Sequence, residues 1–202
     1  MKTILKILKR FAIILLAVMA CIYLFFELGG YCITNKAERG SMAKTIKQAP
    51  ALPDNFLRVY GKVYSGALDS TMWGYVFKKG FSRTDFRYPA RDTAVEYCIH
   101  NRNGGFLSIA FTAFLIEDHA TPQQCLQFNM SNCYLTRNIT GVEAASQYYF
   151  KKWLKDITDE QVLELLVMMK NPGLYDKHSS SSRRVKLFYK ALAEFRKRLS
   201  AE

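Results

Sequence analysis

The chain has 202 residues, half of them hydrophobic, and its 29 Lys and Arg against 17 Asp and Glu give a formal net charge of +12 at pH 7. This length can bury one hydrophobic core and leave room for a membrane segment, but it excludes two full domain cores. The basic residues are scattered, with no arginine-rich stripe and no aromatic RNA-binding box, which argues against nucleic acid as a partner. Residues 34–202 alone carry a formal net charge of +9. This positive charge would favour contact with an anionic membrane surface, but it is equally compatible with ordinary solubility.

The N-terminal segment combines a basic start with a long apolar run. Four cations within residues 1–10 precede an uncharged stretch over residues 11–26, and residues 28–33 extend it past Glu27 to approach the roughly 20 apolar residues that a spanning helix needs. This pattern predicts a cytoplasmic basic N-terminus at 1–10 and a transmembrane anchor at 11–33, with the rest of the chain outside. A signal peptide cleaved near Ala20 and a lipoprotein attachment box at Cys21 are the alternatives.

The cysteines and histidines show no pattern typical of a metal site or a redox motif. Five cysteines include no Cys-x-x-Cys pair, and the three histidines add no metal-ligand spacing, so we expect no metal and no cofactor. Outside the apolar segment, Cys98 could pair with Cys125 or Cys133 in an oxidising compartment. The alternative is that all three are small core residues.

Residues 34–89 predict a linker followed by the start of a globular domain. Residues 34–53 are polar and contain one glycine and two prolines, which favours a linker, and Asp54 is a plausible N-cap for a helix over residues 55–64. Residues 68–89 are aromatic and basic without a helical period, which predicts loops and short elements. Such a composition is typical of a surface that lies at a membrane interface. The alternative is that the aromatic residues form a small hydrophobic core and the charged residues between them are solvated. The candidate membrane-surface residues are Trp73, Lys78, Lys79, Phe81 and Arg83.

From residue 92 onward the sequence predicts helices. Asp92 is a candidate cap for a helix to residue 100, residues 106–117 form an almost wholly apolar helix, and Thr121-Pro122 starts another. Residues 158–161 read as a capping box, and residues 185–199 have apolar side chains at helical spacing. The fold class is therefore predicted as mainly α, with the globular domain at residues 54–199.

Residues 141–176 carry the most specific pattern in the chain. They contain a Gly-Val-x-Ala-Ala opening, a Tyr-Phe-x-Lys step, a capped helix and an Asn-Pro-x-x-Tyr exit. This order resembles the closing motif of the family 51 glycosyltransferases, the biosynthetic peptidoglycan transglycosylases and glycosyltransferase domains of penicillin-binding proteins. The matching positions, mainly structural in character, are Gly141, Val142, Ala144, Ala145, Tyr149, Phe150, Lys152, Ile157, Thr158, Glu160, Leu163, Leu165, Lys170, Asn171, Pro172 and Tyr175. Lys151 stands where the family has glycine.

Upstream of this segment, the resemblance implies that the catalytic positions are lost. Gln127 and Ser131 replace the family's glutamate and asparagine, and an amide cannot exchange a proton as an acid does. Residues 105–109, where the family has its phosphate-binding cations and a glutamate, carry no charge, and no carboxylate lies near Tyr64 at the expected place of the first acid. Glu96 and Glu117 are the weak candidates for relocated catalysts; solvated acids near helix ends are the alternative.

The resemblance implies a lysozyme-like helical glycosyltransferase domain on a single N-terminal transmembrane helix, in the bacterial inner membrane with the C-terminal domain in the periplasm or outside. With the catalytic motifs depleted, the expected role is that of a pseudoenzyme that binds membrane lipid together with lipid II or a glycan strand, or docks on a cell-wall synthesis or secretion complex. One alternative is an active lipid II polymerase with rearranged acids. Another is a purely structural envelope protein.

Overall fold

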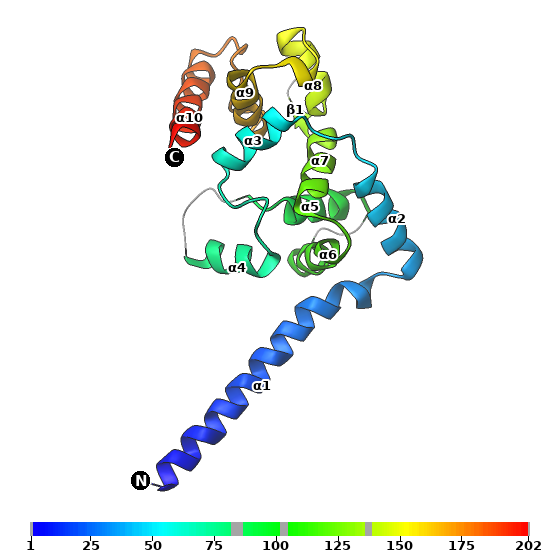
Figure 1. The fold of residues 1–202 in the computed structure, drawn as a ribbon, viewed down its shortest axis with the longest axis vertical. Coiled ribbons are helices and arrows are strands. Elements are labelled where there is room, and N and C mark those ends of the chain that lie inside the picture. Colours follow the sequence, from blue (N-terminus) through cyan, green and yellow to red (C-terminus); the bar gives the residue numbers. More distant parts are fainter. Residues whose placement is uncertain (1, 82–86, 102–104, 136–138, 202) are drawn as a thin grey trace.

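The computed structural model describes residues 2–81, 87–101, 105–135 and 139–201 as a helical body on one end of a long straight helix (Figure 1). The fold is mainly α. In chain order the elements are α1 (Lys2–Ile33), α2 (Lys36–Lys47), α3 (Asp54–Val63), α4 (Met72–Phe81), α5 (Pro89–Asn101), α6 (Phe106–His119), α7 (Pro122–Asn132), β1 (Tyr134–Leu135), β2 (Ile139–Thr140), α8 (Val142–Phe150), the 3-10 helix η2 (Leu154–Asp156), α9 (Asp159–Lys170) and α10 (Ser182–Ser200).

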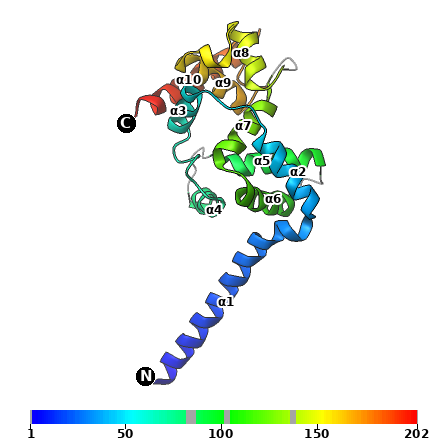
Figure 2. The same ribbon diagram turned by 45° about the vertical axis from the view of Figure 1, so that its right-hand side comes forward.

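The first helix, α1, projects from the body with most of its apolar surface uncovered (Figures 1 and 2). Within the described part of the chain it is the one helix long and apolar enough to cross a membrane, over Ile4–Ile33 with a mean hydropathy of 2.6. Its most apolar stretch has no buried residue, which distinguishes it from the core helix of a soluble domain. Because a signal sequence near the N-terminus has the same length and composition, these properties fit both an anchor and a signal.

The C-terminal end of α1 packs closely against α6. A Cβ atom on Gly29 would lie 2.3 Å from the Phe111 ring, and one on Gly30 would lie 2.6 Å from the Phe111 carbonyl oxygen and 2.7 Å from Leu115 Cβ. Only glycine therefore allows the two helix backbones to approach this far. The Tyr31 hydroxyl adds a hydrogen bond to Asp118 Oδ2 at 2.9 Å, which ties the C-terminal end of α1 to the end of α6.

The segment predicted as a linker is folded instead. Residues 36–47 form α2, which begins where the Asn35 side chain accepts a hydrogen bond from the Glu38 N–H at 2.9 Å. Met42 and Ile46 lie one turn apart and are each 2% exposed, because α2 packs on α7 and contributes to the core. Two buried apolar residues in a polar helix give a weak periodic signal, which explains why the sequence pattern favoured a linker.

The body has two neighbouring hydrophobic clusters. The upper cluster joins α3 to α7–α10 and the short hairpin, and its fully buried members include Phe56, Leu163, Phe188 and Phe195. The second cluster joins α2 and α4 to α5 and α6 and includes Tyr88 and Leu115. The all-apolar helix predicted over residues 106–117 is confirmed as α6, which occupies the middle of this second cluster.

Two of the four predicted N-terminal helix caps are confirmed. Thr121 and Thr158 each accept a hydrogen bond from the N–H three residues on, and the glutamines at those positions, Gln124 and Gln161, complete the two capping boxes. The predicted caps Asp54 and Asp92 were wrong, because each helix begins earlier. Asp54 is the first residue of α3, and α5 starts at Pro89, whose fixed φ suits the first turn.

The remaining differences from the sequence-based predictions concern α4, a short hairpin and the cysteines. Residues 68–89, predicted as loops and short elements, contain the ten-residue helix α4, and β1 and β2 form a two-stranded antiparallel hairpin that the helical pattern did not predict. The cysteines are free thiols, and the interpretation as core residues is confirmed for Cys98 and Cys125, which are fully buried. Burial raises the pKa of the Cys125 thiol to about 12, so it is unreactive at neutral pH.

Lys151, which stands where the resembled family has glycine, has a backbone conformation that favours glycine. Lys151 ends α8 in the left-handed conformation, with φ of 58°, and is the single non-glycine residue with positive φ among those described. This conformation costs a side-chain-bearing residue about 1–2 kcal/mol, partly offset by the greater freedom of glycine when unfolded. We expect Lys151→Gly to stabilise the protein by about 0.5–1 kcal/mol in thermal unfolding. Lys155→Gly, in η2, should instead destabilise it; a loss of stability in Lys151→Gly would contradict this account.

Candidate functional site

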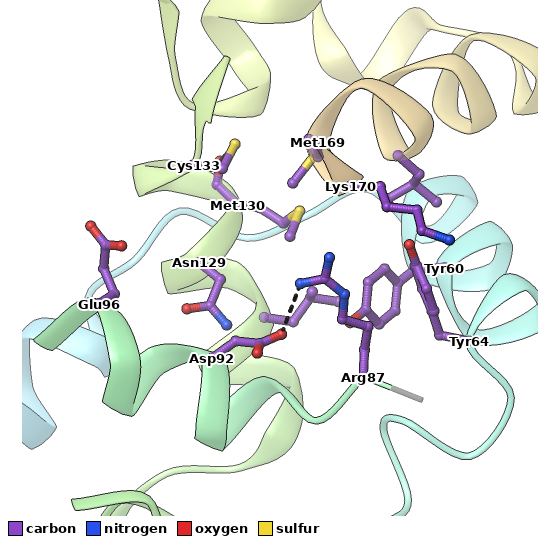
Figure 3. Close-up of a pocket in the computed structure, with 12 residues that line it drawn as sticks. Tyr60, Tyr64, Arg87, Asp92, Glu96, Asn129, Met130, Cys133, Met169 and Lys170 are labelled. Carbon is purple, nitrogen blue, oxygen red and sulfur yellow. Dashed lines mark hydrogen bonds and ion pairs between the residues drawn. The ribbon is translucent and has the colours of Figure 1, made fainter. Parts of the chain in front are cut away.

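A cavity of about 190 Å³ lies where α3, α5, α7 and α9 meet, beside the loop that leads into α5 (Figure 3). In this cavity charged and aromatic side chains from distant parts of the sequence converge. The lining residues are Tyr60, Tyr64, Arg87, Asp92, Glu96, Leu126, Asn129, Met130, Cys133, Leu166, Met169 and Lys170.

Two cations border the cavity from different sides. Arg87 precedes α5, whereas Lys170 ends α9 (Figure 3). The Lys170 Nζ lies 5.8 Å from the centre of the Phe195 ring, so its ammonium group also contacts the face of an aromatic ring on α10. A pair of cations separated in this way can bind a phosphate or pyrophosphate group between them.

Both carboxylates of the cavity come from α5. Asp92 and Glu96 lie four residues apart on one face of the helix. Arg87 Nη1 lies 3.4 Å from Asp92 Oδ2, and Arg91 Nη1 lies 3.2 Å from Asp92 Oδ1, so two guanidinium groups neutralise Asp92. Glu96 lies farther along the helix, beyond Asn129, and is half-buried (Figure 3).

The wall opposite α5 is aromatic. The rings of Tyr60 and Tyr64 on and just after α3 lie 5.0 Å apart, and both residues are about 4% exposed. Burial, and secondarily the charge of Asp92, raises the pKa of Tyr60, which keeps its phenol neutral and unable to act as a base at ordinary pH. Tyr64 stands where the resemblance would place the family's first acid.

Asn129 fixes α7 to α5 at the floor of the cavity. Its Nδ2 donates to the Pro89 carbonyl at 3.0 Å, and its Oδ1 accepts from the Thr93 hydroxyl at 3.0 Å. The two degenerate family positions do not line this cavity. The Ser131 hydroxyl donates back to the Gln127 carbonyl at 2.9 Å, and Ser131 instead borders a separate hollow beside Gly141.

Glu117, one of the two candidate catalysts, lies away from the cavity and organises the start of α4. Both of its carboxylate oxygens accept from the Met72 N–H at 3.0 Å, and Oε1 also accepts from the Tyr88 hydroxyl at 2.9 Å. Burial raises the pKa of Glu117, with smaller contributions from Glu27 and Asp118, although these hydrogen bonds oppose the shift. Glu96 is therefore the only one of the two candidates that borders the cavity.

These contacts predict different behaviour for two Glu117 variants. Glu117→Ala should destabilise the protein by about 1–2 kcal/mol, because it removes the acceptor for α4 and for Tyr88. Glu117→Gln keeps an acceptor and removes the charge. Because the folded-state pKa of Glu117 is raised, its contribution to stability falls as the pH rises from its ordinary value of 4.5 through the raised value.

Thermal unfolding of the parent and Glu117→Gln between pH 4 and 7 measures this effect. The glutamine variant should gain stability relative to the parent as the pH rises. A difference that stays constant over this range, or that grows in the opposite direction, would rule out the raised pKa.

The matched motif at residues 141–176 holds α8, α9 and the following turn in place. Gly141 has φ of 83° and its N–H donates to the Cys133 carbonyl at 2.8 Å, while Val142 and Ala145 are buried. Tyr149 stacks on His178 with ring centres 5.4 Å apart. Ile157, Leu163 and Leu165 are also buried, and Lys170 borders the cavity. The remaining matches cap helices, form turns, pack partly buried against the core or lie on the surface: Ala144, Phe150, Lys152, Thr158, Glu160, Asn171, Pro172 and Tyr175.

Of the predicted membrane-surface residues, Trp73 and Lys78 lie on α4. The Trp73 indole donates to Glu27 Oε1 on α1 at 2.8 Å, so this ring joins α4 to the apolar helix. Arg83 and the side chains of Lys79 and Phe81 lie outside the described residues.

Sequence reasoning missed the convergence of Arg87, Asp92, Asn129 and Lys170. The spacing of Asp92 and Glu96, four residues apart, was the one available signal, because it places both acids on one helix face. In the described parts of the chain, no three His, Cys, Asp or Glu side chains come together as metal ligands.

Comparison with known proteins shows what the C-terminal part of the chain is similar to. Residues 107–193 match the model of the family described as Transglycosylase, so this part of the chain is similar to the lysozyme-like transglycosylase domains. The match runs from α6 into the first part of α10 and includes the floor and the α9 side of the cavity.

Curated relatives support the same conclusion. The chain is 32% identical to a biosynthetic peptidoglycan transglycosylase of Acinetobacter baumannii over 65 residues, which are 32% of this chain and 29% of the relative. It is 33% identical to penicillin-binding protein 1A of Streptococcus oralis over 70 residues, or 35% of this chain and 11% of the relative. The alignments thus span less than a third of the length of these relatives, and the chain is their distant homologue.

Proposed function

We propose that this protein is a membrane-anchored transglycosylase homologue of the bacterial inner membrane that binds lipid II, or the glycan made from it, without polymerising it. In this proposal residues 11–33 anchor the chain, residues 1–10 lie in the cytoplasm and the helical body lies on the periplasmic or outer side. The body then meets lipid-linked substrates at the membrane surface.

Binding is supported by the composition of the cavity. Arg87 and Lys170 offer two positive charges for a pyrophosphate, and Asn129 and the tyrosine hydroxyls offer neutral hydrogen-bonding groups for a sugar. The cavity itself is smaller than the roughly 300–1,000 Å³ typical of ligand pockets, so it suits one part of an extended ligand.

Loss of polymerase activity is supported by the arrangement of the acids, and this observation carries the proposal. Glycosyl transfer needs a carboxylate base opposite the cations that stabilise the leaving group. Here Asp92 is neutralised by Arg87 and Arg91, and both acids lie on α5. Among the described residues that line the cavity, α3 and α9 supply no carboxylate. Loss of a positioned base alone lowers a rate by about 10²–10⁴-fold.

An active polymerase is the second candidate, favoured by one observation. Glu96 borders the cavity that also holds Arg87 and Lys170, so it is placed to serve as a relocated base. If the protein is an active polymerase, it should polymerise lipid II, and this activity should depend on Glu96.

The anchor is supported by the exposed apolar surface of α1, which needs lipid around it if it is retained. Intact-mass analysis of the protein extracted from membranes should give the full-length chain. A mass that corresponds to loss of about the first 20 residues would show a cleaved signal and contradict the anchor.

Binding is tested with the full chain in nanodiscs that contain lipid II. Arg87→Gln and Lys170→Gln should each weaken binding about tenfold, since a charge-assisted hydrogen bond contributes about 1.5–3 kcal/mol. Lys186→Gln, at an exposed position on α10, is the matched control and should bind as the parent does. Equal affinities for all four proteins would mean that the cavity is not the binding site.

A further inference from the structure

A second, apolar cavity lies on the other side of α5, between α4 and α6. We call it the α4–α6 groove; its volume is about 450 Å³, and its lining includes Phe26, Trp73, Val76, Phe106, Ile109 and Phe114. It shares no lining residue with the charged cavity. Its size falls within the range of pockets that hold a small ligand.

The groove opens through side chains that the body leaves uncovered. On the α4 side, Val76 is 42% and Phe77 60% exposed, and on the α6 side, Phe106 is 81% and Leu107 49% exposed. Both helices thus carry exposed apolar residues, of which Val76 and Phe106 line the groove. A contiguous exposed apolar surface of this kind marks a site for a membrane or another apolar partner.

The position of the groove beside α1 identifies the partner. Phe26 of α1 is part of the lining, and the Trp73 ring stacks on Tyr23 with centres 5.5 Å apart and meets Phe26 at 6.0 Å. In both views α4 and α6 form the edge of the body that faces α1 (Figures 1 and 2). Because the exposed surface of α1 and the opening are continuous, the lipid that surrounds α1 also reaches the groove.

A single charged residue among those lining the groove indicates the kind of lipid. The Arg91 side chain is 41% exposed, and its Nη1 contacts Asp92 at 3.2 Å. A guanidinium beside an apolar groove complements a phosphate at the end of an acyl chain, whereas the carboxylates of Glu117 and Glu27 point to Met72 and Trp73 instead.

We propose that the α4–α6 groove binds an acyl chain of an anionic glycerophospholipid from the leaflet next to the body, with Arg91 near the lipid phosphate. The bound lipid fills the space between α4, α6 and α1 and fixes the body against the membrane. This inference rests on the proposed anchoring of α1 and is independent of what the charged cavity binds.

The test uses the full chain in nanodiscs that contain a photoactivatable phosphatidylglycerol or phosphatidylethanolamine, with crosslinked peptides identified by mass spectrometry. The parent should crosslink on α4 and α6, several-fold more with phosphatidylglycerol. Val76→Trp, which fills the opening from an exposed position, and Ala110→Trp, which fills the interior, should each reduce crosslinking at least fivefold. Ala193→Trp, at an exposed position on α10, is the control and should match the parent.

Two further experiments ask whether Arg91 causes the preference for the anionic lipid, and whether the bound chain comes from a phospholipid or from lipid II. Arg91→Gln should retain crosslinking but lose the preference for phosphatidylglycerol. Excess lipid II should leave crosslinking unchanged; displacement by lipid II would assign the groove to a polyprenyl chain and overturn the proposal. Crosslinking of Val76→Trp at the parent level would overturn it as well.

Failure of the anchor is distinguishable from failure of the groove. If intact mass shows full-length chain and crosslinking on α4 and α6 is absent, the groove proposal is wrong while the anchor holds. If the chain is cleaved, the anchoring on which this inference rests is wrong, and the groove proposal is overturned with it.

Discussion

Gly30→Leu should destabilise the protein more than any substitution on the exposed face of α1. A Cβ at this position would lie 2.6 Å from the backbone carbonyl oxygen of Phe111 and 2.7 Å from Leu115 Cβ, so α1 and α6 would have to separate. At Gly29 the three atoms nearest to an added Cβ belong to the Phe111 ring, whereas at Gly30 the nearest atom is a backbone oxygen, which a side-chain rotation cannot move. Overpacking of a close contact costs about 1–3 kcal/mol, so we expect a melting temperature about 5–10 °C lower.

Differential scanning fluorimetry in detergent measures the effect of this change, and Gly40→Ala provides the control. Gly40 lies in α2, where a Cβ would meet nothing within 4 Å, so alanine should be neutral or stabilising by up to about 1 kcal/mol. A Gly30→Leu protein as stable as the parent would show that α1 does not pack on α6 as described.

Gly141→Ala should have the second large effect, although Gly141 lies at the opposite end of the body. The residue has φ of 83° and ψ of 149°, a conformation almost confined to glycine, and a Cβ there would lie 2.7 Å from the Ser131 carbonyl oxygen. Strain and contact together should cost about 3 kcal/mol. This result would establish the first residue of the matched motif as a requirement of the fold.

Chemical denaturation gives the free energy of unfolding for Gly141→Ala, with Gly61→Ala as its matched control. Gly61 lies inside α3 with open space around it, so alanine should stabilise that helix. If both substitutions had the same small effect, the strained turn before α8 would not be needed for stability.

The helical parts of the fold could be predicted where one local signal sufficed. Thr121 is an N-cap followed by proline, Thr158 starts a capping box with Gln161, and the apolar run of α6 is long enough to identify a helix. The α2 helix escaped prediction because only Met42 and Ile46 are buried in an otherwise polar sequence. Its place against α7 depends on the tertiary structure.

The candidate site was less accessible to sequence reasoning for the same reason. The matched motif fixed the fold of α8 and α9 but could not indicate that Lys170 would lie opposite Asp92, which is 78 positions earlier in the chain. Resemblance alone also offered Glu96 and Glu117 as equivalent candidates. The structure separates them, because Glu117 holds the start of α4 whereas Glu96 borders the cavity.

The charged cavity and the α4–α6 groove together suggest how a non-polymerising homologue would work at the membrane. The first offers cations and neutral polar groups, and the second offers an apolar surface continuous with α1. The two are separated by α5, where Arg91 faces the groove and its neighbour Asp92 faces the cavity. The body would thereby be held against the lipid while the cavity stays open to a headgroup.

The central proposal is binding without polymerisation, and a lipid II polymerisation assay tests it most directly. The full-length chain, its Glu96→Gln variant and an active peptidoglycan glycosyltransferase are each incubated with labelled lipid II, and the products are separated by size. We expect glycan strands from the active enzyme alone, while the full-length chain retains labelled lipid II. Strands made by the full-length chain and lost in Glu96→Gln would contradict the proposal and identify Glu96 as a relocated catalytic base.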